Sequence, residues 1–276
     1  NNSLMLRAVQ YAKMFGITVI DHCEDYALSE GSVMNEGFVS TKLGLRGVPN
    51  AAEDIVVSRN VIFASSTGAH IHLQHISSGT AVEIIRRAKA RGINITAEAT
   101  PHHISLTEEE VESFNPNFKV NPPLRSDEDR LAIIKGLEDG TIDCIATGHA
   151  PHIDYEKDVE FDRAPYGVIG LETALSVVLE ELHFTKRLSL SGTLSLLTHR
   201  ASEILNLNKG TLDVGTEADV TLFDLTEKWT PKDKAFFSKS SNSPWLGREL
   251  TGKVKKTFVA GHLVFENDKI LSTDQD

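Results

Sequence analysis

The chain has 276 residues, 40% of them hydrophobic and 24% charged, an ordinary globular composition with length for one barrel-sized domain or two smaller ones. Its 39 acidic and 28 basic residues give a net charge of −11, which argues against a nucleic-acid or anionic-membrane partner. Cys23 and Cys144 offer no disulfide framework, and no apolar stretch reaches the length of about eighteen residues that a membrane span needs. We therefore expect a soluble, cytoplasmic protein.

The first 150 residues alternate between helical and extended patterns. Apolar residues at helical spacing predict a helix from Leu4 that ends at Gly16, where a β-branched run begins. Strands that alternate with helices imply a parallel sheet with right-handed crossovers, and hence an α/β fold. The predicted strands cover residues 17–21, 70–75, 93–97 and 142–146, and the helices between them lie at 51–66, 81–90 and around 131–137.

The pattern changes near Lys209 and Gly210. Helices are predicted around 173–182 and 194–205, whereas 219–225 and 255–265 alternate as β-strands, with a hairpin turn at Gly261. We therefore predict one domain over 1–208 and a small β module over 209–276.

Polar side chains gather where the predicted strands end. His22 follows the first strand, His75 ends the second, and His149 and His152 follow the last. In parallel barrels, functional side chains lie at the C-terminal ends of strands. Neutral imidazole is a natural zinc ligand, but a histidine at a strand end also serves as a hydrogen-bonded pocket residue. Spacing alone leaves both interpretations open.

Two motifs carry a resemblance to a known family. Residues 142–152, Ile-Asp-Cys-Ile-Ala-Thr-Gly-His-Ala-Pro-His, resemble the last barrel strand of the dihydroorotases, a branch of the cyclic amidohydrolases, and Asn121-Pro122-Pro123-Leu124-Arg125 resembles a loop of the same family. The resemblance implies the C-terminal half of an amidohydrolase-type (β/α)8 TIM barrel, strands 5 to 8, plus part of a small β-sandwich module. Four strands are readable where a closed barrel needs eight, so only the later part of the family is matched.

The resemblance also implies a metal site. His22 and His75 match metal ligands of the family, whereas Gly148 stands where the family has an aspartate that binds metal and carries a proton. The family binds two Zn²⁺ ions per site, and the residues present here support at most one. His102 and His103 are expected to lie behind the ligands or to pack.

The implied substrate contacts come from three segments. Asn121 matches a residue that contacts the pyrimidine ring, and His152 matches another substrate contact. Tyr166 and Gly167 match a segment whose backbone groups face the same ligand. The prolines after Asn121 restrict the backbone, so this loop is able to hold an amide side chain still.

The implied reaction is the reversible cyclisation of N-carbamoyl-L-aspartate to dihydroorotate in pyrimidine biosynthesis. Gly148 and the absence of four barrel strands predict impaired activity for the chain as written. The alternative is a catalytically silent homologue or gene fragment with a structural role, acting as a homo-oligomer or beside another enzyme of the pathway. Neither hypothesis predicts a nucleic-acid or membrane partner.

Overall fold

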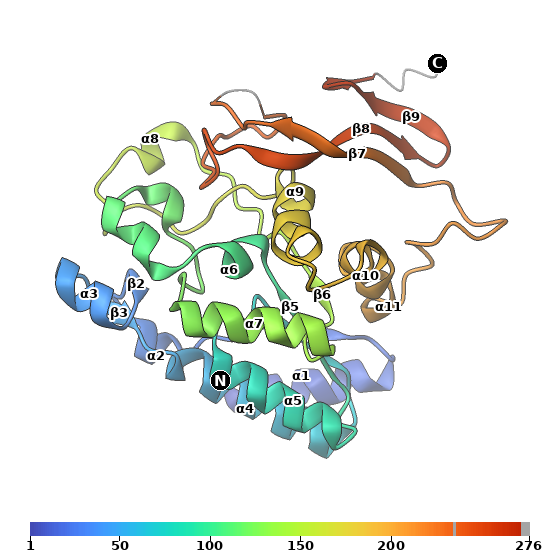
Figure 1. The fold of residues 1–276 in the computed structure, drawn as a ribbon. Coiled ribbons are helices and arrows are strands. Elements are labelled where there is room, and N and C mark those ends of the chain that lie inside the picture. Colours follow the sequence, from blue (N-terminus) through green and yellow to red (C-terminus); the bar gives the residue numbers. More distant parts are fainter. Residues whose placement is uncertain (234–235, 272–276) are drawn as a thin grey trace. The chain divides into compact units, whose positions relative to one another are not determined.

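The computed structural model describes residues 1–233 and 236–271 (Figure 1). The chain forms two compact units, one of Asn1–Leu171 with Phe236–Pro244 and one of Glu172–Ala235 with Trp245–Asp276. Helices that follow residue 172 thus group with the C-terminal strands. The boundary at 208/209 marks the change of sequence pattern and stays a prediction.

The first unit is built on a parallel sheet with the strand order β1-β4-β5-β6. Each strand overlaps a predicted one, and the register pairs Ile71 with both Val19 and Ile95. All four strands therefore end at the same edge of the sheet, where the predicted histidines lie. The strand bounds are β1 (Val19–His22), β4 (Ile71–Gln74), β5 (Ile95–Ala99) and β6 (Cys144–Ile145).

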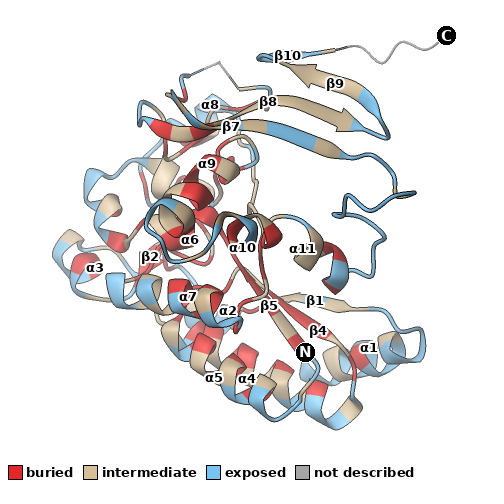
Figure 2. Cartoon of the chain, turned by 45° about the vertical axis from the view of Figure 1, so that its right-hand side comes forward, coloured by how far each residue is buried: buried red, intermediate tan, exposed pale blue. Residues whose placement is uncertain are grey.

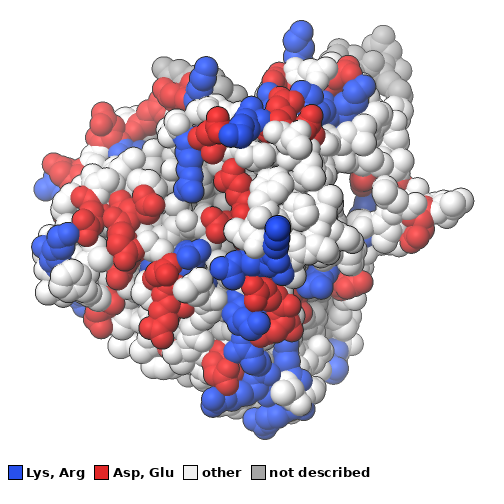
Figure 3. Space-filling view, viewed as in Figure 1, with Lys and Arg blue, Asp and Glu red and all other residues white. Residues whose placement is uncertain are grey.

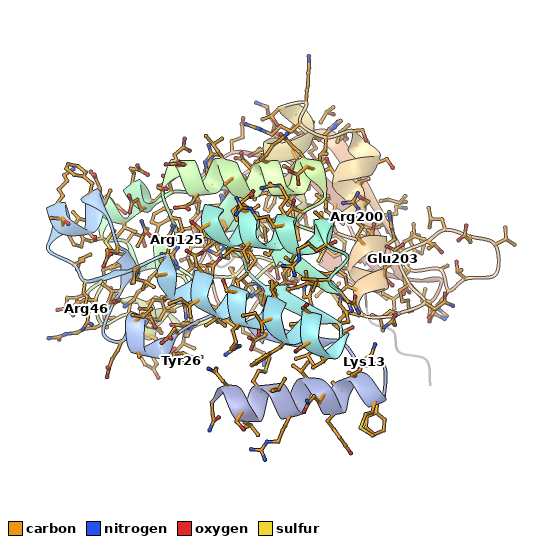
Figure 4. The ribbon with its side chains drawn as sticks, turned by 90° about the horizontal axis from the view of Figure 1, so that it is seen from below. Lys13, Tyr26, Arg46, Arg125, Arg200 and Glu203 are labelled. Atoms are coloured by element: carbon orange, nitrogen blue, oxygen red, sulfur yellow. The ribbon has the colours of Figure 1, made fainter. Side chains whose placement is uncertain are left out.

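Helices connect these strands, and local sequence sets their ends. Ser78 and Ser126 accept hydrogen bonds from backbone N–H groups at two helix N-termini, and Gly68 and Gly140 end two helices in the left-handed conformation. Figure 4 shows α1, α4, α5 and α7 side by side. The helices are α1 (Asn2–Met14), α2 (Tyr26–Ser29), α3 (Phe38–Leu43), α4 (Ala51–Thr67), α5 (Gly79–Ala90), α6 (Pro101–Ser105), α7 (Asp127–Asp139) and α8 (Asp154–Lys157), with 3-10 turns η1 (Glu108–Ser113) and η2 (Pro116–Phe118) and a small sheet of β2 (Met34–Asn35) and β3 (Gly47–Val48).

The core of this unit lies between the sheet and the helices. Ile71, Leu73 and Ala97 of β4 and β5 have no exposed surface, and neither do Ile85 of α5 and Ile133 of α7. Figure 2 shows buried residues along β4 and β5. Side chains alternate between the two faces of a strand, so His72, Thr96 and Glu98 lie on the face away from these helices. That face carries the polar residues considered below.

The second unit joins helical segments to an antiparallel sheet of order β10-β9-β8-β7. The predicted hairpin is present, with Val259 paired to His262 across the turn at Gly261. Trp229 Nε1 donates a hydrogen bond to Ser176 Oγ over 3.0 Å and so ties sheet to helix. The elements are α9 (Ala174–Val178), the π-helical η3 (Leu179–Phe184), α10 (Leu190–Ser195), α11 (His199–Ile204), β7 (Val220–Trp229), β8 (Leu250–Val259), β9 (His262–Glu266) and β10 (Lys269–Ile270).

Acidic and basic side chains are interspersed over much of the face that Figure 3 draws, and basic side chains gather toward its lower edge. Within the described ranges, no helix has both the length and the hydropathy of a membrane crossing.

Candidate metal and substrate site

A pocket of about 400 Å³ lies at the C-terminal ends of the parallel strands, a size typical of small-molecule sites. It gathers residues from strand ends and from two later loops, and six of the seven predicted site residues line it. His152 is the exception and lies directly beside it, against the Tyr166 carbonyl. The lining consists of His22, His75, His102, Val120, Asn121, Gly148, His149, Ala150, Tyr166 and Gly167.

The predicted ligands His22 and His75 face each other in this pocket. Their ring centroids are 6.1 Å apart and the rings are nearly perpendicular. His22 is the last residue of β1, and His75 follows β4 with a positive φ of 52°. The left-handed conformation is uncommon for a non-glycine residue and turns the His75 ring out of the strand path.

The side chain of Glu98 lies behind His75. Its Oε1 is 2.7 Å from His75 Nδ1, and its Oε2 accepts a 3.0 Å hydrogen bond from His72 Nε2. Burial alone raises the pKa of Glu98, but the contacts with His72 and His75 outweigh it and hold this pKa at about 2. Glu98 is therefore a carboxylate at neutral pH. Sequence analysis missed this residue because the strand was predicted to end at Ala97.

Asn121 is held from the opposite side of the pocket. Its Nδ2 donates a 2.9 Å hydrogen bond to Glu24 Oε2, and Ser29 Oγ donates to the other oxygen of Glu24 over 2.6 Å. The amide is thereby fixed with its oxygen available for a ligand. Glu24 lies in the segment that follows β1, and only the folded register brings it to Asn121.

His152 and the Tyr166-Gly167 segment are linked to each other. His152 Nε2 is 2.9 Å from the Tyr166 carbonyl and its Nδ1 is 3.1 Å from Glu156 Oε2. Both partners are acceptors, and a neutral imidazole has one N–H to donate. The Gly167 N–H donates to the Lys119 carbonyl over 2.9 Å. A ligand that uses these groups must replace the existing bonds.

A side chain at Gly148 would lie in front of the His75 ring and in close contact with His102. A Cβ placed on Gly148 would lie 3.8 Å from His75 Nε2 and 3.1 Å from His102 Cε1. Because Gly148 itself lines the pocket, this distance also places His75 Nε2 on the pocket side of the ring. The φ of Gly148 is +59°, a conformation that aspartate and asparagine adopt more readily than most residues.

His102 and His103 follow β5 and are buried. Burial lowers the pKa of His102 well below its ordinary value and lowers that of His103 to about 3. His103 Nε2 donates a 3.0 Å hydrogen bond to the Pro122 carbonyl, and its Nδ1 is 2.9 Å from Thr100 Oγ1. It therefore packs behind the Asn121 loop, whereas His102 reaches the pocket.

We expect the chain to lose stability as the pH falls below about 6.5. The unfolded chain protonates His103 near its ordinary pKa of 6.5, whereas the folded chain keeps it neutral down to about pH 3. The contribution of neutral His103 to the free energy of unfolding is thus fully present above pH 6.5 and is lost as the pH falls. At pH 5 the loss from this one group is on the order of 2 kcal/mol. Urea unfolding at pH 7 and pH 5 measures the change. His103→Asn should lose less over the same interval, and an equal loss would refute the assignment.

Two imidazoles of the pocket, those of His22 and His75, are candidate ligands for one metal ion. His75 presents Nε2 to the pocket while Glu98 contacts its other nitrogen, the arrangement typical of metal-binding histidines. His22 supplies a second imidazole with its side chain 28% exposed. Ligand atoms of His72, Glu98 and Cys144 also lie within 4.8 Å of one another, and all three residues are buried.

Comparison with known proteins gives consistent matches. A profile of the amidohydrolase family matches residues 1–264. The chain is 49% identical to a dihydroorotase of Trichlorobacter lovleyi and 50% identical to one of Citrifermentans bemidjiense, in each case over 96% of this chain and 62% of the relative. It therefore spans about three fifths of the length of these relatives.

Solved structures show the same fold. The L-hydantoinase (dihydropyrimidinase) of Arthrobacter aurescens superposes with a TM-score of 0.88 at 24% identity, over 99% of this chain and 62% of that structure. The dihydropyrimidinase of Brevibacillus agri gives 0.84 at 21% identity, over 96% of this chain and 60% of that structure. These likenesses establish the partial parallel barrel and the added antiparallel sheet.

Proposed function

The chain belongs to the amidohydrolase family, and on this premise we propose that it carries part of the site of a dihydroorotase, which interconverts N-carbamoyl-L-aspartate and dihydroorotate. The observation that supports this most is the gathering of His22, His75 and Asn121 around one pocket at the ends of parallel strands. The names of the 45–50% identical relatives support the same activity.

His22 and His75 would hold a zinc ion. When bound, zinc acts as a Lewis acid on a carbonyl oxygen and lowers the pKa of water. Among the residues of this chain, Glu98 would orient His75 for that role, and Val120 and Ala150 supply apolar parts of the pocket lining. A second ion finds no oxygen ligand at Gly148.

Asn121 and His152 are suited to an acidic cyclic amide. The fixed Asn121 amide oxygen accepts from a ring N–H, because its Nδ2 is already bound to Glu24. His152 lies beside the pocket, where a ring N–H could donate to a substrate carboxylate, which dihydroorotate has and hydantoin lacks. Together they favour dihydroorotate over neutral five- and six-membered cyclic amides.

A silent homologue remains the second candidate, and Gly148 is the observation that favours it. General acid–base catalysis needs a titratable side chain within reach of the leaving nitrogen, and glycine has none. In that case the chain acts as a cytoplasmic structural partner, in a homo-oligomer or beside another enzyme of the pathway. The two candidates differ in whether an aspartate at position 148 restores turnover.

The substrate assignment is tested with the chain joined behind the N-terminal part of the Trichlorobacter lovleyi relative and carrying Gly148→Asp. Dihydroorotate is expected to give a higher kcat/KM than hydantoin or allantoin. Asn121→Ala and His152→Ala should each lower the value for dihydroorotate by about 10- to 100-fold, the cost of one hydrogen bond to a charged or buried group. Faster turnover of hydantoin or allantoin than of dihydroorotate would contradict the proposal.

A further inference from the structure

A row of polar side chains leads from His75 away from the pocket, across β4 and β5. Glu98 stands first in the row and contacts both His75 and His72. His72 Nδ1 is 2.8 Å from Thr96 Oγ1, and the same oxygen is 2.8 Å from His70 Nε2. His72 and Glu98 are buried, with 3% and 9% of their side chains exposed. His75 Nδ1 and Glu98 Oε1 are buried and make no regular hydrogen bond to any group, so their 2.7 Å contact with each other is the polar contact available to both.

The row continues to the residue directly before β1. His70 Nδ1 is 2.9 Å from Thr18 Oγ1. The residues involved come from three adjacent strands or their flanks, in the register that pairs His72 with Ile20 and Thr96. The row is thus a product of the parallel sheet and not of any local motif.

When the three histidines are neutral, the contacts along the row allow only one assignment of hydrogen-bond donors and acceptors. An ionised carboxylate only accepts, so Glu98 requires N–H groups on both His72 Nε2 and His75 Nδ1. His72 Nδ1 then accepts from the Thr96 hydroxyl. Thr96 in turn accepts from His70 Nε2, which leaves His70 Nδ1 to accept from Thr18. Each neutral ring has one donor and one acceptor, and both positions are used in His70 and His72.

We propose that Glu98 is a positioning residue that locks His75 in the tautomer with a proton on Nδ1 and a lone pair on Nε2. The row through His72 and Thr96 in turn fixes the Glu98 carboxylate. The Nε2 lone pair then faces the pocket, 3.8 Å from the position of a Cβ on Gly148. The consequence for metal binding rests on the proposed role of His75 as a ligand, whereas the tautomer itself does not.

A metal site at His72, Glu98 and Cys144 is the competing reading of the same cluster. It is disfavoured because both nitrogens of His72 and both oxygens of Glu98 already contact protein partners. An ion there would have to break the contact that orients His75. Cys144→Ser separates the two readings, since it removes a ligand of the competing site and leaves the row intact.

The tautomer is measured by ¹⁵N NMR of histidine-labelled, metal-free chain, with the His75 signals identified by their loss in His75→Gln. We expect a protonated Nδ1 and an unprotonated Nε2 at neutral pH in the wild-type chain. A proton on Nε2 would overturn the proposal even if no variant folds. Glu98→Ala and the better-filling Glu98→Met should convert His75 to a mixture of tautomers, and an unchanged His75 spectrum in a folded variant would also overturn it.

Zinc affinity gives the second readout. Glu98→Ala and Glu98→Met are expected to weaken zinc binding by about 10- to 100-fold, the usual cost of removing the partner behind a histidine ligand. Cys144→Ser should leave affinity unchanged, and a loss there would favour the competing site and overturn ours. If the wild-type chain shows the expected tautomer but binds no zinc, the proposed function fails while the assignment of Glu98 stands.

Discussion

Gly148→Asp is expected to raise dihydroorotate hydrolysis by ~10²–10⁴-fold when the chain is joined to the N-terminal part of a dihydroorotase relative. The backbone already places the new Cβ 3.8 Å from His75 Nε2, so the carboxylate starts beside the proposed metal ligand. The His102 ring, whose Cε1 would be 3.1 Å from this Cβ, must shift by a few tenths of an ångström. Aspartate in the left-handed conformation costs about 1 kcal/mol, far less than the expected gain in transition-state stabilisation.

The matched control is Gly148→Ala, which adds the same Cβ without a carboxylate. Steady-state rates and zinc content are measured for the glycine, alanine and aspartate forms. The alanine form should stay as inactive as the glycine form, and zinc should rise from about one to about two per chain only with aspartate. Equal activity of the glycine and aspartate forms would remove the catalytic role assigned to this position.

Arg125→Ala is expected to destabilise the chain by ~3–5 kcal/mol, because it leaves Glu53 buried without its cation. Arg125 (labelled in Figure 4) and Glu53 are 3% and 2% exposed. The guanidinium donates to Asn35 Oδ1 over 2.8 Å, to the Val48 carbonyl over 2.7 Å and to Ser77 Oγ over 3.1 Å. It thereby holds the end of the Asn121-Pro122 loop against β3 and the segment after β4.

Urea unfolding at pH 7 measures this loss, and two further variants interpret it. The double variant Arg125→Met, Glu53→Gln removes both charges and should recover a substantial part of the stability. Arg87→Ala removes an arginine that is 77% exposed in its ion pair and should cause no resolvable change. If Arg125→Ala lowers the free energy of unfolding no more than Arg87→Ala does, the buried contacts of Arg125 do not stabilise the loop.

Much of the fold follows from patterns that act over short distances. Alternation of helices and strands predicted the parallel sheet, and Gly16, Gly68 and Gly140 end helices where left-handed backbone is required. The predicted ends of the strands were less accurate. The last strand was predicted over 142–146, whereas β6 covers only Cys144 and Ile145. The N–H groups of Asp143 and Ala146 still donate to carbonyls of β5, so the difference concerns where the assigned strand ends and not the pairing itself.

The site was predictable where a residue stands at a strand end, and hidden where the partner lies on another strand. His22, His75 and Asn121 follow from position and resemblance, and the structure brings them into one pocket. Glu98 and Glu24 carry no local signal, since their importance comes from contacts with His75 and Asn121 across the sheet. Register is a property of the folded sheet, and one residue of slip would have turned Glu98 to the other face.

The central claim, that His22 and His75 form a metal site, is tested most directly by equilibrium dialysis of the chain as it stands against zinc. We predict close to one zinc ion per chain, with affinity lowered by at least ~10–100-fold in each of His22→Asn and His75→Asn. His262→Asn, which alters an exposed histidine of the second unit, should bind zinc like the wild type. Zinc binding that survives both His22→Asn and His75→Asn, or that is absent from the wild-type chain, would contradict the account.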